Sequence, residues 1–74
     1  MSNLPSFDGQ TLIKVLRKFG FEVIRIKGSH HFLRHEDGRS TVIPVHQKET
    51  IGIDLFHKIL KDCEISVEDL LKLR

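Results

Sequence analysis

A histidine and an arginine on one face of a strand are the first residues in this sequence that could do chemistry on a phosphate. Residues His30 to His35 read as an extended strand, and alternation places His30, Phe32 and Arg34 on the same face. An imidazole can take or give a proton near neutral pH, and a guanidinium pairs with phosphate through a two-pronged fork. Because RNA supplies its own nucleophile, the 2′-hydroxyl, these two side chains are the minimum needed for phosphodiester cleavage.

The same residues also fit functions without catalysis. An exposed strand histidine often has no catalytic role, and a cationic strand face can hold RNA by shape and charge without cutting it. A metal site is disfavoured, because alternation separates His30 from His31 and no cysteine lies near them. We therefore predict no metal and no small-molecule cofactor. The histidines weighed as metal ligands are His30, His31, His35 and His46.

Length and composition indicate one small domain. The chain has 74 residues, enough for a single domain over 1–74, with a core of about 8–63 and a short helix of about 66–73. Cys63 is the only cysteine, so it forms no internal disulfide, and it reads as a small buried apolar residue. The sequence shows no signal-peptide pattern and no apolar run of about 18 residues. We expect a cytoplasmic protein with no membrane partner.

Charge is unevenly distributed along the chain. The net charge is only +2, but basic side chains gather in the middle third and acidic ones in the tail. A cationic region of this kind can meet a phosphate backbone, although a solvated strand face would look similar. The basic residues of the middle third are Arg25, Lys27, Arg34 and Arg39.

Periodicity predicts the order helix, three strands, two helices. A first helix runs from Asp8 as N-cap to Gly20, and a second begins near Ile51 or Gly52. Ser66 opens a last short helix with a Ser-x-x-Asp cap, and its apolar side is Val67, Leu70, Leu71 and Leu73. The predicted strands are Phe21 to Lys27, His30 to His35 and Ser40 to His46.

The predicted fold class is α+β, with a three-stranded antiparallel sheet and helices packed on one face. Pro44 cannot donate to a sheet ladder, so the third strand should be an edge or carry a bulge. Leu33, Ile43 and Val45 make the better inward set, which leaves the opposite face open. Expected core residues are Leu12, Leu16, Phe19, Ile43 and Ile59.

The open face should carry His30 and Arg34, with Phe32 available to stack on a base, and His46 as a further member. Phe32, Val42 and Pro44 would form an apolar patch around His30. An apolar patch rimmed by charge on so small a domain indicates a protein interaction site.

Three segments together resemble one known family. They are Gly28-Ser29-His30-His31-Phe32-Leu33-Arg34-His35, then Asp37-Gly38-Arg39, and then Val42-Ile43-Pro44-Val45-His46. Their order and spacing are similar to the central motif of the HicA toxins. Leu12 to Leu16 and Gly20-Phe21 resemble the family's opening helix and first strand, so the likeness covers nearly the whole chain.

The resemblance implies a fold like that of a double-stranded-RNA-binding domain (dsRBD), α-β-β-β-α with a short extra helix. It also implies the toxin of a toxin–antitoxin system: a metal-independent endoribonuclease, or mRNA interferase, acting on messenger RNA. The family's catalytic histidine follows Gly-Ser, which corresponds to His30, and a HicB-type antitoxin covers the same site. A non-catalytic RNA-binding module is the alternative. The expected RNA contacts are Lys27, Gly28, Ser29, Phe32, Arg34 and His46.

The chain departs from the family pattern at two places. The second helix usually begins with Gly-Thr, where this chain has Gly52-Ile53, so a possible cap or phosphate contact is lost. Family members commonly have Ala-Gly before Ile-Ser, where this chain has Cys63-Glu64. Neither change affects His30.

Overall fold

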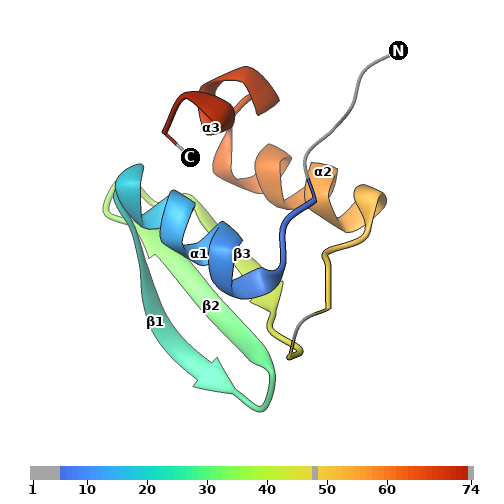
Figure 1. Cartoon of the computed structure of the whole chain (residues 1–74). Coiled ribbons are helices and arrows are strands. Elements are labelled where there is room, and N and C mark those ends of the chain that lie inside the picture. Colours follow the sequence, from blue (N-terminus) through green and yellow to red (C-terminus); the bar gives the residue numbers. More distant parts are fainter. Residues whose placement is uncertain (1–5, 48, 74) are drawn as a thin grey trace.

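The computed structural model describes residues 6–47 and 49–73 and confirms the α+β fold. Figure 1 shows the three helices on one side of the sheet, with the other side left open. Within the described residues, no helix combines the length and apolar character that crossing a bilayer would need. The elements, in chain order, are α1 (Gly9–Lys18), β1 (Phe21–Lys27), β2 (His30–His35), β3 (Ser40–Pro44), α2 (Ile53–Cys63) and α3 (Val67–Leu73).

Helix α1 begins where the sequence predicts. Asp8 is its N-cap: the Thr11 backbone N–H donates to Asp8 Oδ1 at 2.7 Å, and this hydrogen bond lowers the pKa of the Asp8 carboxyl. Leu12 and Leu16 are fully buried, as predicted. Phe19 is only half-buried, which corrects the prediction that it lies in the core. The helix ends at Lys18, so Phe19 is the C-cap and lies beyond the helical turns that face the sheet.

The sheet has the order β1-β2-β3, with both pairs antiparallel. β3 is an edge strand, as Pro44 predicts, but it ends at Pro44 and not at His46. Pro44 has no N–H for the ladder. After one further bond, from the Val45 N–H to the Ser29 carbonyl at 2.7 Å, the chain turns away, and the Glu49 N–H donates to the His46 carbonyl.

Strand β1 contains an irregularity that the sequence does not reveal. The pairing with β2 shifts between Val23 and Arg25, so Ile24 is an extra residue, as in a β-bulge. Strict alternation would place Ile24 and Ile26 on one face, but because Ile24 is the extra residue, Ile26 pairs with His31 of the inner face. Both side chains are exposed, at 60% and 59%. Beyond the bulge, Arg25 and Lys27 pair with residues of the open face of β2.

The core lies between the sheet and the helices. Leu33 and Ile43 are fully buried, which confirms the predicted inward face of β2 and β3. Cys63 is also fully buried, and this burial raises the pKa of its thiol to about 12, so the thiol stays protonated at neutral pH. The prediction that Cys63 is a structural apolar residue is confirmed. The buried hydrophobic residues are Phe7, Leu12, Ile13, Val15, Leu16, Phe21, Leu33, Ile43, Phe56, Ile59, Leu60, Cys63, Ile65 and Leu70.

The two C-terminal helices are capped in different ways. α2 has Gly52 as its N-cap, and because glycine has no side chain there is no side-chain cap bond. In α3 the predicted cap is confirmed, because the Asp69 N–H donates to Ser66 Oγ at 3.0 Å. The predicted apolar side of α3 is only partly covered, because Leu71 and Leu73 are each 40% exposed. α3 has only seven residues and buries a single one, Leu70.

Glu64 ends α2 in a backbone conformation that suits glycine better. Its φ is 57° and its ψ is 44°, the left-handed region where a Cβ meets the following carbonyl oxygen. We expect Glu64→Gly to raise the free energy of unfolding by about 0.5–1 kcal/mol, measured by urea denaturation. Glu64→Ala keeps the Cβ and should not stabilise the protein. Equal effects of the two substitutions would contradict the strain explanation.

Candidate nucleic-acid interface

The register of the sheet arranges the open face in three rows that cross all three strands. Row 1 is Lys27, His30 and Pro44; row 2 is Arg25, Phe32 and Val42; row 3 is Glu22, Arg34 and Ser40. Directly opposed residues lie on the same face, with Cβ atoms about 4.5–5.5 Å apart. The predicted side-by-side placement of His30, Phe32 and Arg34 is therefore confirmed.

Row 1 places a cation directly beside His30. The two-residue turn Gly28-Ser29 joins β1 to β2, and the φ of Gly28 is 59°, as a type II′ turn with glycine first requires. Lys27 and His30 are direct partners across this turn. Both are exposed, and within the described residues the His30 side chain makes no hydrogen bond or ion pair. Its imidazole is therefore free to contact a ligand.

Backbone contacts hold row 1 in place from behind. The Ser29 carbonyl accepts the Val45 N–H at 2.7 Å, and His31 Nδ1 lies 3.4 Å from the same oxygen. Gly9, the first residue of α1, packs so closely on β3 that a Cβ there would lie 2.5 Å from the Pro44 carbonyl oxygen. The turn before His30 and the strand beside it are thus fixed to the body of the domain.

Row 2 supplies an aromatic ring. Phe32 is half-buried between its strand partners, and the guanidinium carbon of Arg25 lies 5.9 Å from the centre of its ring. Phe32 is among the RNA contacts expected from the sequence, whereas Arg25 was counted only among the basic residues of the middle third. The two-residue turn would have identified it, because pairing Lys27 with His30 places Arg25 near Phe32. Row 2 is therefore a cationic, aromatic surface suited to an unpaired base.

Row 3 carries a second guanidinium. Arg34 is exposed and forms no ion pair within the described residues, although Glu22 is its partner on β1. Together the rows hold three basic side chains against one carboxylate. Rows 1 and 2 are cationic and the two charges of row 3 balance, so the open face as a whole is cationic, which suits a phosphate backbone.

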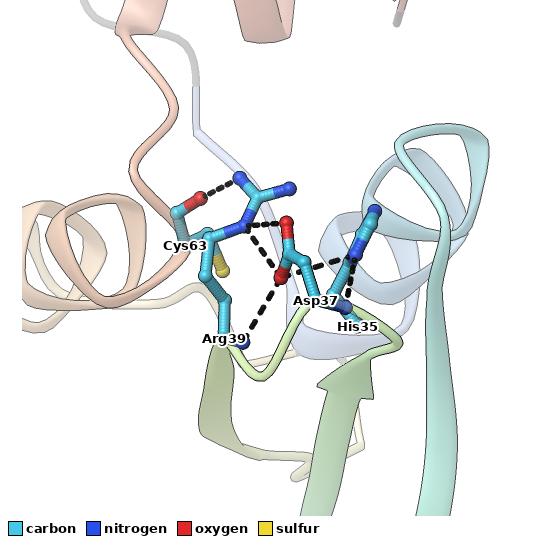
Figure 2. A network of polar contacts seen from close by, with 4 residues as sticks. All are labelled: His35, Asp37, Arg39 and Cys63. Atoms are coloured by element: carbon cyan, nitrogen blue, oxygen red, sulfur yellow. Dashed lines mark hydrogen bonds and ion pairs between the residues drawn. The ribbon is translucent and has the colours of Figure 1, made fainter.

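Arg39, the fourth basic residue of the middle third, belongs to none of the three rows and has a structural role. Figure 2 shows its guanidinium between Asp37 and the carbonyl oxygen of Cys63, which accepts from Arg39 Nη1. Arg39 Nε lies 2.9 Å from Asp37 Oδ2. The hydrogen bond from Arg39 holds the pKa of the Asp37 carboxyl below its ordinary value, and the pKa of Arg39 is raised in turn. This network fixes the β2–β3 turn to the end of α2.

His35 completes this network at the opposite end of β2 from His30. Its Nδ1 lies 3.1 Å from Asp37 Oδ1 and equally far from the Asp37 backbone nitrogen (Figure 2). Its ring packs edge-on against the ring of Phe21. Since His35 and His31 belong to the inner face, the strand separates them from His30, as predicted. No three metal-binding side chains come together within the described residues.

His46 is the one predicted site residue that the sheet does not position. It is exposed, two residues past the end of β3, in the loop that leads to α2. The alternation that grouped it with His30 assumed a strand as far as His46, and that part of the prediction was wrong. His57 is exposed on α2.

Comparison with known proteins adds one match. No curated protein matches this chain. A family model described as the HicA toxin of bacterial toxin–antitoxin systems matches residues 9–65, which include α1, the whole sheet and α2. A toxin of such a pair has an antitoxin as its partner. The match and the observed fold agree with the resemblance noted in the sequence, and the chain belongs to the HicA toxin family.

Proposed function

We propose that this toxin is a metal-independent endoribonuclease that cleaves messenger RNA, with His30 as the general acid or base. The observation that carries the proposal is row 1: an exposed, unbonded imidazole beside the Lys27 ammonium on a cationic sheet face. Such a pair provides a proton-transfer group and a positive charge at one phosphate. The family membership supports the same conclusion, because the catalytic histidine expected from the resemblance is His30.

The reaction needs no group other than those on the open face and the RNA. The 2′-oxygen attacks the adjacent phosphorus, the bond to the 5′-oxygen of the next nucleotide breaks, and one proton passes from the 2′-hydroxyl to that 5′-oxygen. His30 takes or gives this proton, and Lys27 stabilises the negative charge that builds up on the phosphoryl oxygens. The products are a 2′,3′-cyclic phosphate and a free 5′-hydroxyl. Proton transfer of this kind contributes about 10²–10⁴-fold in rate.

The remaining contacts would position the RNA. The Gly28-Ser29 turn brings backbone close to the scissile phosphate, and Arg34 binds a phosphate further along the strand. Phe32 stacks on a base, and His46 reaches the RNA from the loop after β3. A HicB-type antitoxin would bind this same face, since Phe32, Val42 and Pro44 are half-buried apolar side chains rimmed by charge.

The experiment that tests this function is cleavage of a defined messenger RNA fragment with and without a chelator. We expect the rate to be unchanged by the chelator, the products to carry a cyclic phosphate, and a single 2′-deoxy substitution at the cut site to block cleavage there. Cleavage of the 2′-deoxy site, or its loss with the chelator, would contradict the mechanism. RNA that shifts on a gel without becoming shorter would identify a non-catalytic binding module instead.

A further inference from the structure

A groove of about 420 Å³ crosses the open face on the side of row 3 and reaches the β3 edge. Its apolar wall is made by Ile24 from the β1 bulge, Phe32 from β2 and Val42 from β3. Charged side chains also line it, namely Arg34 from β2 and Lys58 and Asp62 from α2. An apolar groove with a few convergent polar groups is the usual form of a small-ligand site.

The acidic group of the groove is held in place by two donors. Thr41, which is 5% exposed, donates from Oγ1 to Asp62 Oδ2 at 3.0 Å, and Lys58 Nζ lies 3.1 Å from the same oxygen. Within the described residues, Asp62 Oδ1 accepts no hydrogen bond. The groove therefore presents one fixed acceptor with a free oxygen. Lys58 balances the charge of Asp62, and Arg34 makes the groove cationic.

The chemistry of the groove matches a nucleotide. An aromatic ring offers a face for stacking, cations offer contacts for phosphate, and a carboxylate oxygen accepts from the N–H groups on the edge of a base. Arg25 covers part of the Phe32 ring from the β1 side and is not part of the groove lining. The part of the ring that lines the groove stays available to a base.

The position of the groove relative to His30 fits one RNA strand. Phe32 lies two residues along β2 from His30, a step of about 7 Å at 3.4 Å per residue, and Arg34 lies the same distance further. A strand whose cut phosphate is at row 1 therefore meets the aromatic ring next and the Arg34 guanidinium after it.

We propose that this groove is a base pocket, which binds one unpaired nucleobase of the RNA next to the cleaved phosphate and discriminates among bases through Asp62. The inference rests on the proposed nuclease function and adds the substrate form, single-stranded RNA. The base stacks on Phe32 beside Val42, Asp62 Oδ1 accepts one of its N–H groups, and Arg34 holds the following phosphate. A base inside a duplex could not enter the groove.

The test uses 2′-O-methyl trinucleotides of each of the four bases, which have no 2′-hydroxyl and so bind to the intact protein without being cut. In amide NMR spectra we expect shifts at residues 24, 32, 42 and 62 in addition to the row 1 turn. Phe32→Leu keeps the apolar volume but removes the ring, and it should weaken binding about fivefold or more. Asp62→Asn should change the ratio of affinities among the four bases.

Lys58→Ala provides a second variant at an exposed position, and Lys61→Ala is its matched control one turn along the same helix. We expect weaker binding only for Lys58→Ala.

Amide shifts confined to Lys27 through His30, or unchanged affinity in Phe32→Leu, would overturn the pocket while leaving cleavage by His30 intact. If the groove variants bind RNA with unchanged affinity but form a weaker complex with the antitoxin, the groove belongs to the protein partner, and this outcome also overturns the proposal. Failure of the proposed nuclease function would show separately, as an absence of RNA cleavage in the cleavage assay, whatever the binding measurements on the groove give.

Discussion

Replacing His30 with alanine is expected to lower the rate of RNA cleavage by about 10²–10⁴-fold and to leave the fold nearly unchanged. The side chain is exposed and makes no hydrogen bond or ion pair with the described residues, so there is little packing to lose. Substitutions at such positions usually change stability by no more than about 0.5 kcal/mol. Single-turnover cleavage and thermal unfolding, measured on the same preparation, separate the two effects.

His31→Ala is the matched control, because it removes the same side chain one position further along the strand. His31 is half-buried on the inner face, where it pairs with Ile26 and Ile43 and lies beside the Ser29 carbonyl. We expect this variant to lose stability and to retain most of its activity when folded. Full activity in His30→Ala, or activity that returns only with added divalent metal, would show that the residue or the mechanism is wrong.

Leu16→Ala is expected to lower the free energy of unfolding by about 2–5 kcal/mol, because Leu16 is fully buried between α1 and the sheet. Small domains have a total stability of about 5–15 kcal/mol, so this change could leave little of it. Urea denaturation followed by circular dichroism measures the loss. Leu73→Ala removes the same side chain from a position that is 40% exposed and should cost much less. Equal losses would mean that the core does not depend on this face of α1.

The sequence was sufficient to predict the parts of the structure that depend on local periodicity. The bounds of β1 and β2, the Asp8 cap, the Ser66 cap and the inward position of Leu33 all follow from alternation or capping chemistry. His30 also belongs to this class, because its exposure depends only on which face of β2 is buried.

The parts that could not be predicted depend on contacts between distant segments. Nothing near Arg39 in the sequence shows that its guanidinium meets the Cys63 carbonyl, 24 residues away, and so it was counted among the free cations. The groove needs Asp62 and Thr41 to meet across 21 residues. The exposure of Leu71 likewise depends on which neighbouring elements pack against α3.

The bulge at Ile24 has a consequence for how the protein behaves among copies of itself. β1 is an outer strand whose far side pairs with no other described strand, and two exposed isoleucines lie along it. A flat outer strand with exposed isoleucines would tend to pair with the sheet edge of another molecule and so to aggregate. The bulge interrupts the regular row of backbone groups, and Arg25 and Lys27 add like charges that repel a second β1. We therefore expect the two cations proposed to attract RNA also to disfavour pairing of one toxin's sheet with that of the next.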